Sequence, residues 1–191
     1  MNKGSNRKKF YKERNEQILN LFISSPDKAF RLLFDTYYTP LCIYTVQLTD
    51  SFTIAEDIVQ DFFIVFWEKK LYKNIAIDLR SYLFYSIRNN TYQFLKKNNI
   101  ISMEELSESE IDLMDSLLDE SELREKEEKM IKALEKLPKQ ELAAVKAVIL
   151  ENKKYKEAAS ELQISVNTLK TYLTRALKRL RKNNIMIYLY F

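Results

Sequence analysis

The chain has 191 residues and a formal net charge of +4 at pH 7. Its one glycine and three prolines favour helices with few tight turns, and no long period-two alternation indicates a sheet. The lack of histidine and the presence of only one cysteine and one glycine exclude a histidine-based metal site, a disulfide framework and a glycine-rich phosphate loop. We therefore expect an all-α protein that is not an enzyme and that holds no metal and no cofactor.

The charge divides the chain into three parts. Residues 1–97 carry 15 basic and 10 acidic side chains, residues 98–128 carry 2 basic and 12 acidic ones, and residues 129–191 carry 14 and 5. Dense negative charge with few aromatics predicts an extended linker at 98–128. It would join two helical domains at 16–97 and 129–184, and an apolar tail of unassigned function follows at 185–191.

The first quarter of the chain predicts a charged, frayed tail at residues 1–15. Apolar periodicity then predicts helices at Glu16–Ile23 and Asp27–Tyr38. Pro40 is expected to end the second helix, and a separate helical piece is expected at Leu41–Leu48. We expect no signal peptide, because residues 1–14 are basic and polar, and the apolar runs are too short to span a bilayer. Because a single cysteine is typical of a reducing compartment, we expect a cytoplasmic protein that is not a membrane protein.

Thr53 and Glu56 match a capping box and predict a helix to about Lys69. Its buried stripe is expected to contain Ile54, Ile58, Phe62, Val65 and Phe66, widened by Val59, Phe63 and Trp67. The remaining face carries Asp57, Gln60 and Asp61 at spacings of three and four residues. An acidic patch beside exposed aromatics suggests a docking surface for a basic partner helix. A solvated face explains the same residues equally well.

Asp78 is predicted to cap a long helix, Leu79–Lys97. The residues expected inside are Leu83, Phe84, Ile87, Thr91, Phe94 and Leu95. The outer faces are expected to carry Arg80, Tyr85, Arg88, Asn89, Asn90, Tyr92, Gln93, Lys96 and Lys97. Rings can stack on unpaired bases, amides can read base edges and cations can hold phosphates, so single-stranded nucleic acid is a candidate ligand. Half-buried core tyrosines are the alternative.

The C-terminal domain is predicted to contain four helices. The first two run from about Glu122 to Lys136 and from Lys139 to Glu151. The third, Tyr155–Leu162, and a fourth that begins after Ser165 are joined by a tight turn, which is the helix-turn-helix arrangement. Gln163 lies where such a turn usually has glycine, at a cost of about 1 kcal/mol.

The fourth helix is amphipathic and basic. Its apolar stripe is Val166, Leu169, Leu173, Ala176, Leu177 and Leu180, and residues 166–182 include six basic side chains and no acidic one. Polar residues near its start can reach base edges, and its basic end can neutralise phosphates. The candidate DNA-binding residues are Ser165, Asn167, Thr168, Lys170, Thr171, Arg175, Lys178 and Arg179. An ordinary helical hairpin with a solvated basic face is the alternative.

Three stretches, in order, resemble the extracytoplasmic-function (ECF) sigma factors of bacterial RNA polymerase. They are AEDIVQDFFIVFWEKK, LRSYLFYSIRNNTYQFLKK and, after the acidic linker, LPKQELAAVKAVILENKKYKEAASELQISVNTLKTYLTRALKRL. The resemblance covers about Asp27 to Lys182 and implies an initiation factor that binds core RNA polymerase and promoter DNA. It also implies an anti-sigma factor as a partner and no small-molecule substrate. Gln163 and the tail after Asn184 depart from the family pattern.

The resemblance further implies roles for the candidate residues. Asp57, Gln60 and Asp61 match the surface that docks on the polymerase. The helix that reads and melts the minus-ten element is matched by Arg88, Asn89, Asn90, Tyr92, Gln93, Lys96 and Lys97. The second helix of the helix-turn-helix matches the minus-thirty-five reader. The loop Lys69–Asp78 falls near the family's flipped-base site, and the linker matches the segment in the RNA exit path.

Two other classes of protein remain open. A stand-alone helix-turn-helix repressor would need only residues 129–182, and an adaptor or anti-sigma-like protein would use the basic helix to bind an acidic partner. Neither needs the aromatic and amide side chains of residues 79–97, which therefore favour the sigma factor.

Overall fold

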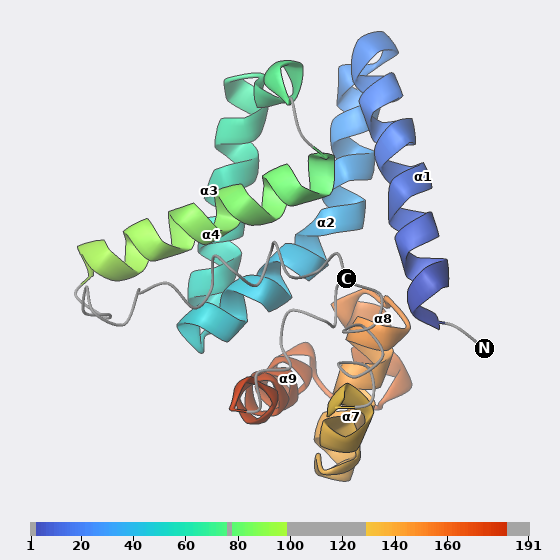
Figure 1. Cartoon of the computed structure of the whole chain (residues 1–191). Coiled ribbons are helices and arrows are strands. Elements are labelled where there is room, and N and C mark those ends of the chain that lie inside the picture. Colours follow the sequence, from blue (N-terminus) through green and yellow to red (C-terminus); the bar gives the residue numbers. More distant parts are fainter. Residues whose placement is uncertain (1–2, 76–77, 99–128, 183–191) are drawn as a thin grey trace. The chain divides into compact units, whose positions relative to one another are not determined.

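The computed structural model describes residues 3–75, 78–98 and 129–182, and every regular element in these ranges is a helix (Figure 1). The prediction of an all-α fold is confirmed. Two compact units are present, one ending at Gln93 and the other beginning at Phe94. The linker predicted at 98–128, apart from Asn98, and the tail at 185–191 lie outside the described residues.

Helix α1 spans Lys3–Ser24, so the prediction of a frayed tail at residues 1–15 is wrong from Lys3 onward. Charged residues dominate the sequence of this segment. They made it hard to recognise a stripe of side chains that are spaced three and four residues apart. The buried members of this stripe are Tyr11, Asn15, Ile18 and Phe22. Burial of that stripe against the rest of the unit supports a helix that local charge alone did not predict.

Helix α2 spans Pro26–Thr49 without interruption, and Pro40 lies inside it. The predicted break at Pro40 is therefore wrong. Proline inside a helix costs about 3 kcal/mol, but here fully buried Tyr37 and Leu41 flank it and the buried face continues on both sides. Figure 1 shows α2 changing direction in its second half, which is the usual consequence of an internal proline.

Helix α3 spans Phe52–Glu68 and begins earlier than the capping box predicted. Ser51, in extended conformation, is the N-cap, and its hydroxyl accepts a hydrogen bond from the Ile54 amide at 3.4 Å. Thr53 is an exposed residue of the first turn rather than the cap. A short 3₁₀-helix, η1 (Leu71–Asn74), follows.

Aromatic side chains fill the space between α2 and the second half of α3. Phe30 contacts both Phe63 and Trp67, with ring centroids 6.0 and 4.9 Å apart, and Phe34 lies 5.1 Å from Phe63. Large rings of this kind bury much apolar surface each, so α2 and α3 form the framework on which the other helices of this unit pack.

Helix α4 spans Leu79–Lys97, as predicted. The Asp78 cap is confirmed, because its Oδ2 accepts a hydrogen bond from the Ser81 amide at 3.0 Å. Of the residues expected inside, Phe94 is only half-buried, and the others are buried. Arg80, expected on an outer face, is 9% exposed instead, because its guanidinium lies over the rings of Tyr11 and Phe84.

The second unit contains a helix at residues 129–135, α7 (Lys139–Val145), α8 (Tyr155–Glu161) and α9 (Val166–Arg181). The helix predicted at Lys139–Glu151 exists, but its second half is a π-helix, η4 (Lys146–Leu150). The predicted start at Glu122 lies outside the described residues. The core consists of aliphatic side chains from all these elements, among them Leu134, Val145, Ile149, Leu169, Leu173 and Leu177.

Two absences hold for residues 3–75, 78–98 and 129–182. No helix in these ranges is long and apolar enough to cross a bilayer. Within the same ranges, no group of three or more cysteine, aspartate or glutamate side chains is arranged to hold a metal ion.

Candidate nucleic-acid interface

Helices α8 and α9 form the predicted helix-turn-helix. Gln163 has a φ of 55°, which is the left-handed conformation that a glycine usually adopts at this position of the turn. The amides of Gln163 and Ile164 donate hydrogen bonds to the carbonyls of Ser160 and Ala159 at 3.1 and 3.0 Å. These bonds satisfy carbonyls at the end of α8 and fix the turn despite the unfavourable residue.

The start of α9 is held by its predicted cap. The Ser165 hydroxyl accepts a hydrogen bond from the Thr168 amide at 3.0 Å, and the two hydroxyl oxygens lie 2.8 Å apart. Both side chains were candidates for DNA binding, and both are engaged within the protein. These two hydroxyls stabilise the N-terminus of α9. The other backbone amides of its first turn point outward from that end and can donate hydrogen bonds to an anion.

One polar face runs along α9. Asn167, Thr171, Arg175 and Lys178 are exposed, and their spacing of four, four and three residues places them on the same side. Lys170 is half-buried, with its Nζ 5.6 Å from the ring centre of Tyr155 on α8. The structure therefore brings together the amide, hydroxyl and cationic side chains that base edges and phosphates require.

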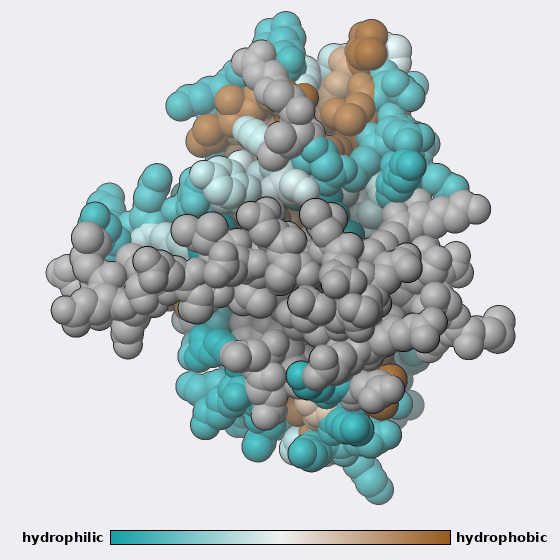
Figure 2. Space-filling view, viewed as in Figure 1, coloured by the Kyte–Doolittle hydropathy of each residue, from teal (hydrophilic) through white to brown (hydrophobic). Residues whose placement is uncertain are grey.

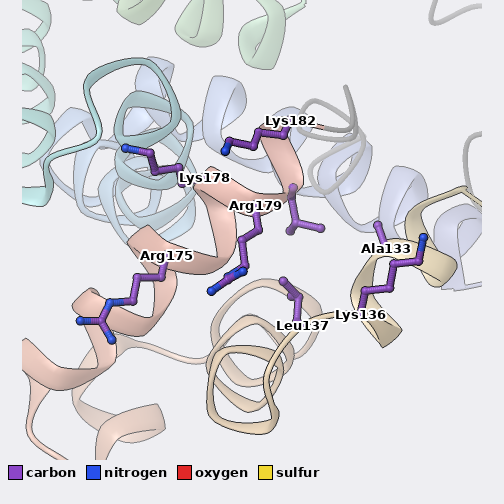
Figure 3. Close-up of a pocket in the computed structure, with 8 residues that line it drawn as sticks. Ala133, Lys136, Leu137, Arg175, Lys178, Arg179 and Lys182 are labelled. Atoms are coloured by element: carbon purple, nitrogen blue, oxygen red, sulfur yellow. The ribbon is translucent and has the colours of Figure 1, made fainter.

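The C-terminal half of α9 borders an open groove of about 550 Å³ (Figure 3). Its opposite side is the helix at residues 129–135 with the turn after it. Apolar residues form part of the lining, and the rest is cationic: Ala133, Leu137 and Leu180, with Lys136, Arg175, Lys178, Arg179 and Lys182. Five positive charges around one groove create a local attraction for anions.

Arg179 forms an ion pair with a buried carboxylate. Its Nε lies 3.1 Å from Oε2 of Glu141, a carboxylate on α7 whose side chain is 7% exposed. Figure 3 shows Arg179 directed toward the neighbouring helices and Arg175 directed away from them. A buried carboxylate requires a partner, so Glu141 competes with any phosphate for this guanidinium. Sequence reasoning missed Glu141, because its partner lies 38 residues further along the chain.

Residues 127–180 match the family model described as Sigma-70, region 4. The match covers α7, η4, α8 and nearly all of α9, and so contains the whole helix-turn-helix. This part of the chain is a sigma-70 region 4 domain. It has a sigma-factor-like DNA-binding role, and the sigma-factor resemblance is confirmed here. No curated protein matches the chain.

Outside the region 4 domain, α3 presents the predicted docking residues. Asp57, Gln60 and Asp61 are all exposed on one side of the helix. The Gln60 amide nitrogen donates a hydrogen bond to the Tyr38 hydroxyl at 3.2 Å, which holds the side chain against α2. The two aspartates remain a negative pair on a helix surface.

The apolar residues beside this acidic pair are aliphatic, contrary to the expectation of exposed aromatics. Ile64 is 54% exposed and Val65, predicted to be buried, is 39% exposed. Ala55 and Phe52 take part in the core instead, which rotates the buried stripe away from Val65. In Figure 2 apolar residues gather at the end of the first unit where α1, η1 and the C-terminal half of α3 lie.

Helix α4 displays the other candidate residues on its accessible side. Asn90, Gln93, Lys96 and Lys97 are exposed, and Arg88, Asn89 and Tyr92 are half-buried. The Arg88 guanidinium lies 5.2 Å from the centre of the Tyr92 ring. A ring backed by a cation, next to amides and lysines, can take part in stacking and phosphate contacts.

Tyr85, predicted on an outer face of α4, lies on the same side and was not among the residues matched to the minus-ten element. Its side chain is 52% exposed, and it precedes Arg88, Asn89 and Tyr92 by three, four and seven residues, which places it on their face. That spacing was visible in the sequence and is the signal that could have identified it.

Proposed function

We propose that this protein is an ECF-type sigma factor that binds core RNA polymerase and directs promoter-specific initiation of transcription. The observation that carries the proposal is the match of residues 127–180 to sigma-70 region 4, which coincides with a complete helix-turn-helix. A sigma factor needs the polymerase and a second promoter contact as well. The first unit offers surfaces of suitable chemistry for both.

In this proposal α9 reads the minus-thirty-five element in duplex DNA. Asn167 and Thr171 lie in the N-terminal half of α9, which would enter the major groove. Their amide and hydroxyl groups would contact base edges there. Arg175 and Lys178, one and two turns further on, would neutralise phosphates. The positive groove beside them strengthens attraction to the duplex and makes binding depend on salt.

The polymerase would dock on α3. A surface that combines the charges of Asp57 and Asp61 with the exposed aliphatic groups of Ile64 and Val65 suits a basic, partly apolar partner helix. Charge would steer the encounter, and the aliphatic groups would contribute buried apolar area once the helices meet. The assignment of this face to the polymerase rests on the sigma-factor proposal.

Helix α4 would hold the melted strand of the minus-ten element. Tyr85 and Tyr92 offer rings for unpaired bases, Asn89 and Asn90 offer amides for their edges, and Lys96 offers a cation for phosphate. The proposal also includes a cytoplasmic location and an anti-sigma factor as a regulatory partner.

In vitro transcription from fragmented genomic DNA of the source organism tests this proposal. Core RNA polymerase would be supplied with or without the protein, and the 5′ ends of the transcripts would be mapped by sequencing. We expect new start sites that share two short upstream motifs at a fixed spacing. Identical start sites in both reactions would reject the sigma-factor proposal.

A further inference from the structure

Helix α1 contacts both ends of the segment that leads from α3 into α4. At one end the Phe22 ring stacks on Tyr72 of η1, with centroids 4.3 Å apart and planes 7° from parallel. At the other end the Asn15 side-chain amide donates a hydrogen bond to Asp78 Oδ1 at 3.1 Å. The Arg80 guanidinium then lies 4.4 Å from the centre of the Tyr11 ring. All three residues of α1 belong to its buried stripe.

Asn15 is the centre of a directional chain of hydrogen bonds. Its Oδ1 accepts a hydrogen bond from the hydroxyl of Tyr37 on α2, and its Nδ2 donates to Asp78. The other oxygen of Asp78 accepts from the amide and the hydroxyl of Ser81, at 3.0 and 3.3 Å. Burial raises the pKa of the Tyr37 hydroxyl, which therefore stays a neutral donor.

The chain of bonds does more than the helix cap requires. The cap needs only the bond between Asp78 and Ser81, which Asp78 could make without Asn15. Asn15 is 6% exposed on the buried stripe of α1, whose other members, Tyr11, Ile18 and Phe22, are apolar or aromatic, and an aliphatic residue would also fill the space. Hydrogen bonds are directional and apolar contacts are not, so the polar chain fixes where α4 begins relative to α1 and α2.

We propose that Asn15 is a positioning residue that anchors Asp78 and thereby sets the direction in which α4 presents Tyr85, Arg88 and Tyr92 to unpaired bases. This inference rests on the proposed function, because α4 matters as a strand-binding helix only in that setting. It makes helix α1 part of the apparatus that opens DNA.

The anchor is tested first on the free protein by amide hydrogen exchange. Asn15→Leu removes both hydrogen bonds and replaces the amide with an apolar side chain of similar size. Asn20→Leu makes the same change on the exposed side of α1. We expect Asn15→Leu to raise exchange about tenfold at the Ser81 and Tyr82 amides, the size expected for one lost hydrogen bond, with α3 unaffected. If the exchange rate at Ser81 is unchanged, or rises equally throughout the unit, the anchor is overturned. This conclusion holds whether or not the protein binds polymerase.

The consequence for DNA is tested with the polymerase complex. We expect Asn15→Leu to lower open-complex formation, measured by permanganate reactivity of unpaired thymines, about tenfold. Polymerase affinity should change little, and Asn20→Leu should behave as wild type. The unfolding temperature of Asn15→Leu should fall modestly, because the buried Tyr37 hydroxyl loses its acceptor. Normal opening by Asn15→Leu would overturn the inference, and so would a parallel loss of opening, polymerase binding and stability, which would indicate a merely structural residue.

Asp78→Ser provides an independent variant. Serine keeps a cap oxygen for Ser81 but is too short to reach Asn15, so it should reproduce the loss of opening. The double variant should be no worse than either single variant if the two residues act through one bond. Additive losses would contradict the coupling. If wild-type protein fails to bind polymerase, the proposed function fails, and hydrogen exchange alone decides the anchor.

Discussion

Helices α4 and α9 are both amphipathic and both carry candidate residues for binding nucleic acid, but their side chains differ in kind. The buried stripe of α9 is aliphatic, and its exposed side carries Asn167, Thr171 and a run of cations. Helix α4 mixes tyrosines, amides and lysines, and its N-cap Asp78 accepts a hydrogen bond from Asn15 of α1. In the proposed function this difference suits two targets: a duplex would be held mainly by charge, and a single strand would be held by stacking on rings whose position matters.

The largest effect is expected at α3, which should separate polymerase binding from DNA binding. Reversing both charges, Asp57→Lys with Asp61→Lys, should lower affinity for core polymerase more than about a hundredfold, because repulsion replaces attraction at the docking face. Affinity for duplex DNA through α9 should not fall. Gel filtration and fluorescence anisotropy measure the two affinities.

A matched control reverses two other exposed charges of the first unit, Glu16→Lys with Asp35→Lys. This control should bind polymerase normally. If the α3 variant also binds normally while remaining folded by circular dichroism, the docking assignment is wrong.

Removing a ring from α4 should weaken single-strand binding without changing its dependence on salt. Tyr92→Ala is expected to cost about 1–3 kcal/mol with a single-stranded minus-ten oligonucleotide in the polymerase complex, because base stacking is lost. Tyr92→Phe keeps the ring and serves as the control. An altered salt slope with an unchanged affinity at low salt would show that α4 acts through charge, as α9 does, and would remove the contrast.

Removing a cation from α9 should have the opposite signature. Arg175→Ala is expected to weaken duplex binding by about 1 kcal/mol and to lower the slope of log K against log salt by about one. Lys132→Ala, which removes an exposed cation outside the helix-turn-helix, should leave both quantities near the wild-type values. Wild-type affinity and slope for Arg175→Ala would mean that this face of α9 does not meet DNA.

The smallest effect concerns Glu141, which pairs with Arg179 and competes with phosphates for its guanidinium. Glu141→Gln removes the charge that Arg179 neutralises, so Arg179 becomes available for a phosphate. We expect two- to fivefold tighter binding to non-specific duplex and a salt slope steeper by about one. An unchanged slope, measured in the same titrations, would show that Arg179 remains occupied or points elsewhere.

The sequence predicted the helix-turn-helix well because its determinants are local. The cap at Ser165, the left-handed turn at Gln163 and the apolar stripe of α9 all lie within about twenty residues of one another. The fold class followed from the low content of glycine and proline for the same reason, since it depends on composition and periodicity rather than on distant partners.

The failures involve contacts between residues far apart in the chain. Tyr11 and Asn15 appeared to belong to a charged tail because their partners, Arg80 and Asp78, lie more than sixty residues away. Pro40 is tolerated because burial on both sides of it favours a continuous helix. Val65 is exposed because the core of the unit selects a slightly rotated face of α3. Periodicity identifies an apolar side of a helix, but the neighbouring helices decide its centre.

Gel filtration of the purified protein with core RNA polymerase tests the central claim most directly. The proposal predicts a stable complex in which the protein elutes with polymerase, and loss of that complex with the Asp57→Lys, Asp61→Lys variant. If the wild-type protein elutes alone and yet binds duplex DNA tightly, it is not a polymerase subunit, and a stand-alone helix-turn-helix repressor becomes the better account of its region 4 domain.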